Sequence, residues 1–370
     1  MNKKRLLIVL QHFRKGGVEI AALNFAMNLD INKYDLTFLL LGPFTEHDKQ
    51  LEQKVVERNI KVIKLSPDAT NYIKRYKKIK LIIKEGNYDI VHSHVMFASG
   101  FVMKAAAQCG VKIRVSHSHA TKWNRKENIA FKIYKFFMRM SINRYATHKL
   151  ACSQDAGYYM YGNKKFSKDG IVLQNGINID RFAFNNEIRK AKRQELNIDE
   201  STFLVGHIGT IYYIKNQTFL VDVFAEILKI RPDAKLILVG EKYDAVPVEK
   251  KIEKLGIEEN VILADSRTDI NELLCAMDVM IFPSLHEALP ISLIEAQASK
   301  LPCLISDTVT QDVKFNDNVD FMSLNENSSL WAQKALELFD ISRENVDISN
   351  LNNIYNIEVI DGRLDEIYSQ

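Results

Sequence analysis

Short apolar segments alternate with longer amphipathic ones along most of this 370-residue chain. A short apolar run between turn signals is typical of a buried strand, and the longer segments have the length of helices. Strands that alternate with helices predict parallel sheets covered by helices on both faces, because parallel neighbours need a crossover connection. A chain of this length is expected to hold about two such domains.

The expected elements fall into two sets. The first has strands at 6–10, 36–41, 61–65, 90–93, 113–116 and 149–152, with helices at 18–29 and 48–58. The second has strands at 203–208, 235–239, 261–264, 279–282 and 302–305, with helices at 216–229, 247–255, 269–277 and 291–299. The pattern breaks at 175–190, so we expect two doubly wound α/β domains, residues 1–180 and 181–370. Ligands of such folds bind beyond the carboxyl ends of the strands, here in the cleft between the domains.

Charge is distributed unevenly along the chain. Residues 1–180 carry 31 Lys and Arg against 14 Asp and Glu, a net +17, whereas the remaining residues carry 19 against 32, a net −13. Two short segments concentrate the positive charge: 71–86 has six basic residues against Glu85, and 122–149 has eight against Glu127. The aromatic and apolar residues Trp123, Phe131, Tyr134, Phe136, Phe137 and Met140 are interleaved in the second segment. A basic half can bind nucleic acid, an anionic membrane or an anionic substrate.

Several protein classes are disfavoured by what the chain contains. Its four cysteines are far apart and form no CxxC pair, which argues against a structural zinc or redox motif and fits a reducing compartment. The apolar run at 6–10 stops at Gln11, short of a signal peptide, and no run approaches the length of a membrane span. We therefore expect a cytoplasmic protein without a transmembrane helix.

Two glycines follow the first expected strand and open a helix. Gly16 and Gly17 would let a ligand approach the backbone, and N–H groups at a helix start attract a phosphate. From the residues alone, a plain turn between strand and helix is an equally good reading. The chain has neither the GxGxxG fingerprint nor a Walker A sequence, so dinucleotide enzymes and P-loop ATPases are disfavoured.

Two His-x-His pairs close strands of the first half. Because side chains alternate along a strand, His92 and His94 share one face, and so do His117 and His119. No cluster of Asp, Glu or Cys completes a metal site around them, so we expect no bound metal. A histidine that only hydrogen-bonds at a sheet edge is the alternative, but the carboxyl end of a strand favours a functional role for at least one.

A lysine in the second half follows a strand and a glycine turn. Lys215 comes after Gly209-Thr210 and directly before an expected helix, where it can contact the oxygens of a diphosphate. A solvated surface lysine is the more common case.

The segment from Phe282 to Ala296 contains the most specific pattern. Glu287 is expected in a loop and Glu295 in the helix that follows it, since Pro290 suits a first helical turn. The N–H groups at the helix start would form an anion site; they belong to Ile291, Ser292 and Leu293.

Several motifs in a fixed order, over nearly all of the chain, resemble the retaining GT-B glycosyltransferases of family four, most closely the bacterial exopolysaccharide and capsule enzymes. The motifs are Gly16-Gly17-x-Glu19, Asp89-x-Val91-His92-Ser93-His94, Ser116-His117-Ser118-His119, Asn175-Gly176-Ile177, Gly206-His207-Ile208-Gly209, Lys215-Asn216, Val239-Gly240, Asp278-Val279, Phe282-Pro283-Ser284 and Glu287-x7-Glu295. The resemblance implies the GT-B fold of two Rossmann-like domains, an acceptor-side domain at 1–180 and a nucleotide-sugar domain at 181–370, with a C-terminal helix that can cross back.

The resemblance also implies roles for matching residues. His119 would lie near the transferring sugar, Lys215 would neutralise the donor diphosphate, and Glu287 would contact the donor sugar. Glu295 would hold the ribose, and the Gly16–Gly17 backbone would lie against phosphates or acceptor. The implied reaction is hexosyl transfer, with retention and without a metal or other cofactor, from a nucleotide-sugar (expected to be a UDP-sugar) to a growing glycan, expected to be lipid-linked.

Two departures from the family pattern leave alternatives open. Thr210 stands where similar enzymes usually have arginine, and Ala288 stands where they have glycine. A catalytically silent partner of another transferase is therefore one alternative, and a GT-B sugar-nucleotide epimerase is another. The basic segments predict docking at the inner face of the cell membrane. We expect no nucleic-acid partner, since no recognised binding module occurs.

Overall fold

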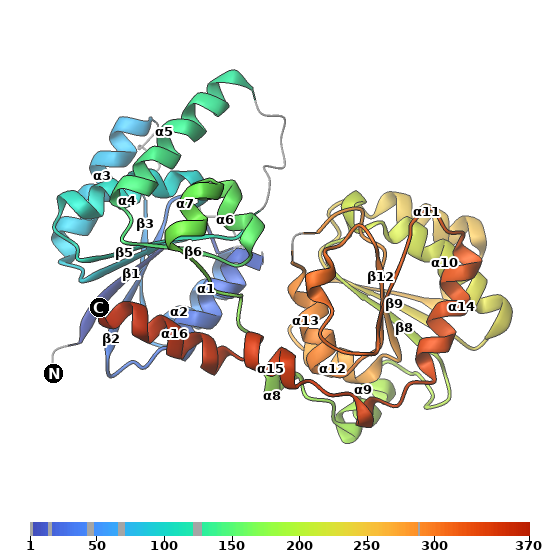
Figure 1. Cartoon of the computed structure of the whole chain (residues 1–370). Helices are drawn as coiled ribbons and strands as arrows, with labels where there is room; N and C mark the ends of the chain where they lie inside the picture. The colour runs from blue at the N-terminus through green and yellow to red at the C-terminus, as the bar shows by residue number, and fades with distance from the viewer. Residues whose placement is uncertain (1–2, 14–16, 43–47, 66–70, 121–127, 288) are drawn as a thin grey trace. The chain divides into compact units, whose positions relative to one another are not determined.

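The computed structural model describes residues 3–13, 17–42, 48–65, 71–120, 128–287 and 289–370 (Figure 1). Gly16, Ala288 and residues 122–127 of the second basic segment lie outside this range. The chain forms two compact units: unit 1 comprises residues 1–177 and 357–370, and unit 2 comprises residues 178–356. The backbone therefore passes from unit 1 to unit 2 and returns.

Unit 1 contains a seven-stranded parallel sheet in the order β3-β2-β1-β4-β5-β6-β7. Its strands are β1 (Lys4–Leu10), β2 (Tyr34–Leu40), β3 (Lys61–Lys64), β4 (Ile90–Ser93), β5 (Ile113–Ser118), β6 (His148–Ala151) and β7 (Gly170–Val172). The six strands expected from the apolar runs are confirmed. The seventh, a three-residue edge strand, is not marked by such a run.

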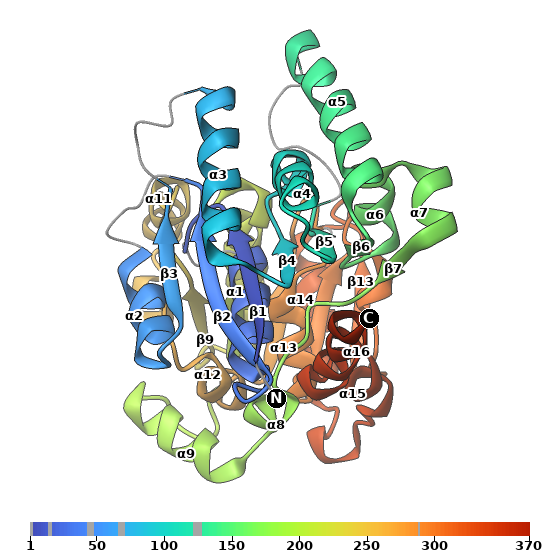
Figure 2. The same cartoon turned by 90° about the vertical axis from the view of Figure 1, so that its left-hand side faces the viewer.

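Helices cover both faces of this sheet (Figure 2). They are α1 (Gly17–Asn28), α2 (Lys49–Glu57), α3 (Tyr72–Gly86), α4 (Ser99–Gln108), α5 (Ile129–Tyr145), α6 (Gln154–Tyr161), α7 (Asn163–Asp169) and α16 (Ile357–Ser369). Along β1, Leu6 and Ile8 face a core shared with α1, α2 and α16, whereas Leu7 and Val9 face one shared with α3 and α4. Burial on both sides explains why the strands are apolar throughout instead of alternating.

Unit 2 repeats the architecture with a six-stranded parallel sheet in the order β10-β9-β8-β11-β12-β13. Its strands are β8 (Leu204–Ile208), β9 (Lys235–Val239), β10 (Val261–Ala264), β11 (Val279–Phe282), β12 (Cys303–Ser306) and β13 (Val319–Met322). Its helices are α8 (Ile179–Phe182), α9 (Asn186–Glu195), α10 (Gln217–Ile230), α11 (Val246–Leu255), α12 (Ile270–Ala276), α13 (Ile291–Ala298), α14 (Ser328–Phe339) and α15 (Ser349–Tyr355). The order of both sheets reverses beside the first strand, so the loops after β1 and β4, and after β8 and β11, flank a switch point. None of the helices in these ranges is both long and apolar enough to cross a bilayer.

The last helix, α16, is an integral part of unit 1. Ile360, Leu364 and Tyr368 are fully buried in the core that also holds β1 and α1. The Ile357 N–H donates to the Ile177 carbonyl at 2.9 Å, directly after the backbone has returned from unit 2. Gly176 lies against this start of α16, because a Cβ there would lie 2.8 Å from Ile357 Cδ1 and 3.1 Å from Ile357 Cα.

We predict that Gly176→Val destabilises unit 1 by about 1–3 kcal/mol, since overpacking must push α16 away from its site. Gly362→Ala is the matched control: the space around a Cβ at 362 is open, and alanine favours a helix. Urea unfolding of both variants and the parent protein tests this. Equal midpoints for Gly176→Val and the parent would show that the contact with α16 does not constrain position 176.

Candidate active site

Lys215 and Glu287 meet at the switch point of unit 2, although 71 residues separate them in the sequence. Lys215 ends a short 3-10 turn, Tyr213–Lys215, between β8 and α10, and Glu287 follows β11. The Lys215 Nζ lies 2.6 Å from Glu287 Oε1, and both side chains are largely buried. The same ammonium lies 4.9 Å from the ring centroid of Phe282, the last residue of β11. The pair places a cation and a carboxylate at one point beyond the strand ends.

A close backbone contact shapes the turn that leads to Lys215. Gly240, directly after β9, has a φ of +153°, and a Cβ there would lie 2.3 Å from the Gly209 carbonyl oxygen. Only glycine fits this contact, which accounts for the Val239-Gly240 motif. The Gly209 N–H donates to the Val239 carbonyl at 2.9 Å, so the two loops are held together.

His207 and Gln217 hold the Thr210 turn in place through a chain of hydrogen bonds. His207 Nδ1 lies 2.9 Å from the Ile281 carbonyl, so this nitrogen carries the proton and Nε2 accepts from the Gln217 amide at 3.3 Å. The same Gln217 Nε2 donates to the Thr210 carbonyl at 3.0 Å. Burial lowers the pKa of His207 to about 4, which keeps this chain of donors and acceptors intact at neutral pH. Thr210 is therefore positioned through its backbone, and the sequence did not reveal the role of Gln217.

The loop that carries Glu287 is tied to the next strand. The Ser284 carbonyl accepts from the hydroxyls of Ser306 and Thr308, each at 2.6 Å. Glu287 itself forms an isolated parallel bridge with Val309. These contacts hold the loop against β12, so the carboxylate is presented to Lys215 by a fixed backbone.

Helix α13 begins at Ile291, the first residue of the expected helix. Pro290 precedes it as the N-cap instead of occupying its first turn. The Leu293 N–H donates to the Pro290 carbonyl at 3.1 Å, so a ligand at the expected anion site would share this donor with the cap. Ile291 and Ser292, both partly exposed, keep the first-turn positions where amides face outward.

Glu295 lies inside α13, as expected. Burial raises its pKa to about 7, and the charge of Arg181 from α8 opposes that rise. A carboxyl group in this state can donate or accept a hydrogen bond near neutral pH. A raised carboxyl pKa at a switch point marks a candidate ligand-binding group.

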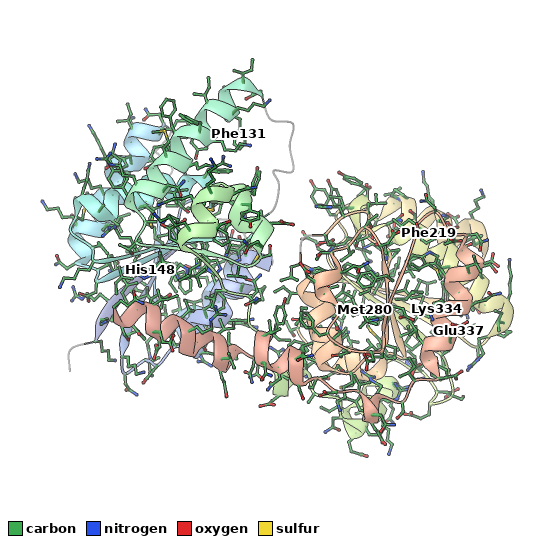
Figure 3. All side chains as sticks on the ribbon, in the orientation of Figure 1. Phe131, His148, Phe219, Met280, Lys334 and Glu337 are labelled. Atoms are coloured by element: carbon green, nitrogen blue, oxygen red, sulfur yellow. The ribbon has the colours of Figure 1, made fainter. Side chains whose placement is uncertain are left out.

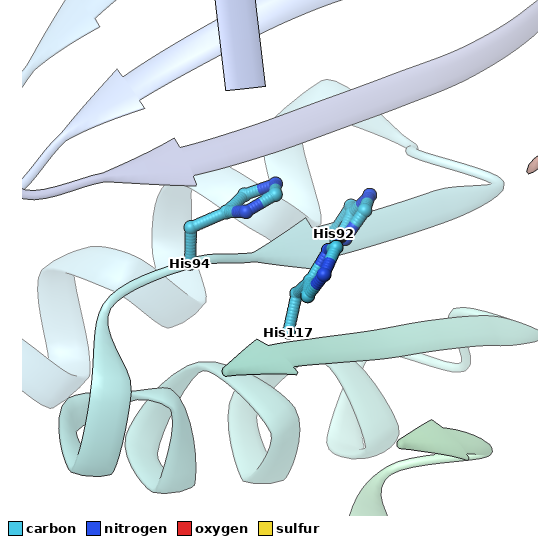
Figure 4. A group of neighbouring side chains, drawn as sticks. All are labelled: His92, His94 and His117. Atoms are coloured by element: carbon cyan, nitrogen blue, oxygen red, sulfur yellow. Dashed lines mark hydrogen bonds between the residues drawn. The ribbon is translucent and has the colours of Figure 1, made fainter. Parts of the chain in front are cut away.

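Four histidine rings form a stacked array at the ends of β4 and β5 in unit 1. Figure 4 shows three of them, His92, His94 and His117. Within each strand the rings stack at 4.2 Å between centroids, His92 on His94 and His117 on His119. Across the strands, His92 Nε2 lies 3.3 Å from His117 Nδ1, and His94 Nδ1 lies 2.8 Å from His119 Nε2. The predicted pairing on one face is confirmed, and the two pairs also contact each other.

Asn175 and Tyr368 complete this array from distant parts of the chain. His119 Nδ1 lies 3.1 Å from Asn175 Oδ1, and His92 Nδ1 lies 2.6 Å from the Tyr368 hydroxyl. With the Asn175 oxygen as acceptor, His119 carries its proton on Nδ1 and accepts from His94 through Nε2. Burial lowers the pKa of His119 to about 4 and that of the other three well below 6.5. His119 is the only one of the four that is partly exposed, and its low pKa keeps the imidazole neutral at pH 7.

The same array contains the best candidate for metal ligands in unit 1. One nitrogen from each of His92, His94 and His117 lies within 4.8 Å of the others. His92 Nε2 faces His117 Nδ1 at 3.3 Å, and His94 Nδ1 faces His119 Nε2 at 2.8 Å, so an ion held here would replace these hydrogen bonds. His117 Nε2 is buried and has no hydrogen-bond partner in the described residues.

The residues predicted to bind ligands thus divide between the two units. Lys215, Thr210, Glu287 and Glu295 belong to unit 2, together with the start of α13. His119 and Gly17 belong to unit 1, where Gly17 is the exposed first residue of α1. Gly16 lies outside the described residues.

Comparison with known proteins decides the family. The model for "Glycosyltransferase Family 4" matches residues 15–181, and that for "Glycosyl transferases group 1" matches residues 188–350. The putative glycosyltransferase EpsF of Bacillus subtilis is 30% identical over 336 residues, 90% of this chain and 87% of EpsF. The chain belongs to glycosyltransferase family 4.

Other proteins match the chain at lower sequence identity. A UDP-Gal:alpha-D-GlcNAc-diphosphoundecaprenol alpha-1,3-galactosyltransferase of Escherichia coli is 24% identical and matches over 79% of this chain and 76% of its own. The capsular polysaccharide biosynthesis glycosyltransferase CapH of Staphylococcus aureus is 26% identical over 79% and 80%. Anabaena Alr3699/HepE, crystallised in complex with UDP-glucose, has a TM-score of 0.77 at 19% identity, with 99% of both chains covered. This likeness confirms the GT-B fold, and CapH among these relatives is named for capsular polysaccharide biosynthesis.

We predict that acid destabilises unit 1 and leaves unit 2 nearly unchanged between pH 6.5 and 4.5. On unfolding in this window, four histidines of unit 1 take up protons, while Asp361, whose pKa burial raises to about 7, releases one. The net proton uptake on unfolding rises toward three as the pH falls to about 5.5, and below that the free energy of unfolding falls by about 4 kcal/mol per pH unit. In unit 2, the proton that His207 takes up on unfolding is balanced by the proton that Glu295 releases.

Hydrogen exchange followed by mass spectrometry at pH 7, 6 and 5 resolves the two units, after correction for the intrinsic exchange rate. Protection in β4 and β5 should fall before protection in β8 and β11. Loss of protection first in unit 2 would contradict the assignment of neutral, buried histidines in unit 1.

Proposed function

We propose that the protein transfers a hexose, with retention, from a UDP-sugar to a growing lipid-linked glycan in exopolysaccharide or capsule synthesis, at the inner face of the cell membrane. The observation that carries the proposal is the Lys215–Glu287 pair beside the start of α13. A leaving nucleoside diphosphate develops negative charge, and a lysine with helix amides beside it is the arrangement that stabilises such charge. The UDP-Gal-dependent relative and the UDP-glucose complex of a protein with the same fold support a UDP-sugar donor.

The proposed roles follow the geometry of unit 2. Lys215 leaves its contact with Glu287 to bind the diphosphate, and the Glu287 carboxylate is then available to the hydroxyls of the donor sugar. The Ile291 and Ser292 amides face the phosphates, and the Thr210 backbone lines the same turn. Glu295, with its raised pKa, accepts or donates to the ribose hydroxyls.

His119 and the Gly16–Gly17 turn are proposed to act on the sugar from unit 1. A neutral imidazole whose Nδ1 proton already bonds Asn175 is a hydrogen-bonding group and not a counter-ion for phosphate. The departing phosphate, not a protein carboxylate, is proposed to take the proton of the acceptor hydroxyl on the same face as it leaves. This front-face route retains the anomeric configuration.

We predict that Lys215→Ala lowers kcat/KM for the donor by about 10²–10³, since one charge that stabilises the leaving group is lost. Glu287→Gln, which keeps the shape and removes the charge, should also lower turnover. Lys250→Ala, an exposed lysine of α11, is the matched control and should keep wild-type rates. The assay measures UDP release from UDP-sugars, with and without a diphosphoundecaprenol-linked acceptor.

The same assay separates the alternatives. UDP release that needs the acceptor supports transfer, whereas a changed sugar-nucleotide without acceptor would show an epimerase. No consumption of any UDP-sugar by the wild-type chain would favour a catalytically silent partner. Wild-type turnover in Lys215→Ala would remove the proposed role of this lysine.

We also propose that transfer needs no divalent metal, because Lys215 and helix amides supply the positive potential. Protein treated with EDTA and dialysed should keep its full rate, and added Mg²⁺ or Mn²⁺ should change it by less than about twofold. A rate that falls at least tenfold and returns with one ion would overturn this part of the proposal.

A further inference from the structure

Helix α5 has an apolar side that nothing in the described part of unit 1 covers. Its exposed members follow helical spacing and are Ile129, Ile133, Phe136, Phe137 and Met140, each more than half exposed. Other sides of the helix pack into the unit: Ser141 donates to the Gly100 carbonyl of α4 at 2.7 Å, and Ile142 is fully buried against residues of β6 and α6. The exposed side is therefore additional to those that hold α5 in the fold.

The start of α3 extends this apolar side. Tyr72 and Ile73 are 63% and 69% exposed, and the Tyr72 ring stacks on Tyr134 of α5 with centroids 5.7 Å apart. Figures 1 and 2 show α3 and α5 on the same side of unit 1, with α4 between them. We call the exposed residues Tyr72, Ile73, Ile129, Ile133, Phe136, Phe137 and Met140 the α3–α5 surface.

The structure divides the aromatic residues of the second basic segment into two groups. Phe131 and Tyr134 are partly buried, and Phe131 packs edge-on against Phe97 at 6.4 Å. Phe136 and Phe137, only a few residues further on, are 59% and 57% exposed. Packing within unit 1 therefore explains the apolar character of Phe131 and Tyr134 but not that of Phe136 and Phe137.

The charge around the α3–α5 surface has one sign. Helix α5 has four basic residues and no acidic one, and α3 has six basic residues with Glu85 alone opposing them. Lys74, Lys77, Lys84, Lys132 and Arg144 are exposed. An exposed apolar stripe bordered by lysine and arginine is the pattern of a helix that lies in a membrane interface with its cations among anionic headgroups.

A second copy of the chain fits this surface poorly. A symmetric dimer would bring the same patch of both copies together, and the basic rims would face each other without acidic partners. An anionic leaflet supplies both missing components, since its headgroups are negative and its acyl boundary accepts the apolar side chains.

We propose that the α3–α5 surface docks on an anionic lipid surface, with α5 lying along the interface and Ile133, Phe136, Phe137 and Met140 inserted. The inference deepens the proposed function, because docking brings the enzyme to a lipid-linked acceptor. Membrane binding is measured with no sugar present. It can therefore fail while sugar transfer succeeds, and sugar transfer can fail while membrane binding succeeds.

Vesicle co-sedimentation tests the proposal with phosphatidylcholine alone and with phosphatidylcholine containing about one third phosphatidylglycerol. The wild-type protein should bind the anionic vesicles, bind the neutral ones at least tenfold more weakly, and dissociate as salt shortens the screening length. Phe136→Ser with Phe137→Ser should weaken binding about tenfold or more. Lys132→Gln with Arg144→Gln should do the same, since each exposed cation near the leaflet is worth about fivefold.

Matched variants in unit 2 complete the design. Tyr243→Ser removes an aromatic ring that is 73% exposed, and Lys250→Gln with Lys254→Gln removes two exposed charges. Both should bind vesicles like the wild type. Circular dichroism and urea midpoints confirm that each variant is folded. In the α5 variants, UDP release from the donor, alone or with a water-soluble acceptor, should be unchanged.

Three results would overturn the proposal. They are equal binding to neutral and anionic vesicles, no binding at low salt, and α5 variants that bind like the wild type. Concentration-dependent dimerisation that the Phe136→Ser/Phe137→Ser variant abolishes would instead assign the surface to a second copy. If binding holds but no sugar is transferred, the docking surface stands and the proposed function fails.

Discussion

The two parallel sheets impose the constraint on which the rest of this structure depends. Parallel strands need crossover helices, which bury both sheet faces and leave only the strand ends open to a ligand. In unit 2 the order reverses between β8 and β11, so the loops after these strands diverge around a space. Lys215 and Glu287 stand on those loops, and their chemistry follows from that position. In unit 1 the order reverses between β1 and β4, and the histidine array occupies the carboxyl ends of β4 and its other neighbour, β5.

Much of the fold could be predicted because burial on both faces leaves a continuous apolar signal. Leu6 to Leu10 and Val279 to Phe282 are buried at every position, and both were recognisable as strands. The edge strands β7 and β13 were missed because neither stands out as a separate apolar run: β7 has only three residues and begins with Gly170, and Asp320 interrupts β13.

The site was predictable in its parts but not in its contacts. Strand alternation placed His92 with His94, but their contact with His117 depends on the register in which Ser93 lies opposite Ser116. The ion pair between Lys215 and Glu287 depends likewise on β8 and β11 being neighbours. Asn175 and Tyr368 contact the array from a loop and a helix that are distant in the sequence. No local sequence pattern indicates these contacts. The bond from the Leu293 N–H to the Pro290 carbonyl was not predictable either, since the first turn of a helix can close on its own cap.

The return of α16 to unit 1 has a consequence for how the protein is made. Synthesis proceeds from the N-terminus, and domains generally fold in that order. Here unit 1 is complete only when residues 357–370 have been synthesised. These residues fill its core beside β1 and include Tyr368, whose hydroxyl bonds His92. Unit 2, an uninterrupted stretch from 178 to 356, is available to fold earlier. During synthesis, all residues of unit 2 are therefore made before the last residues of unit 1, and unit 1 with its histidine array is completed last.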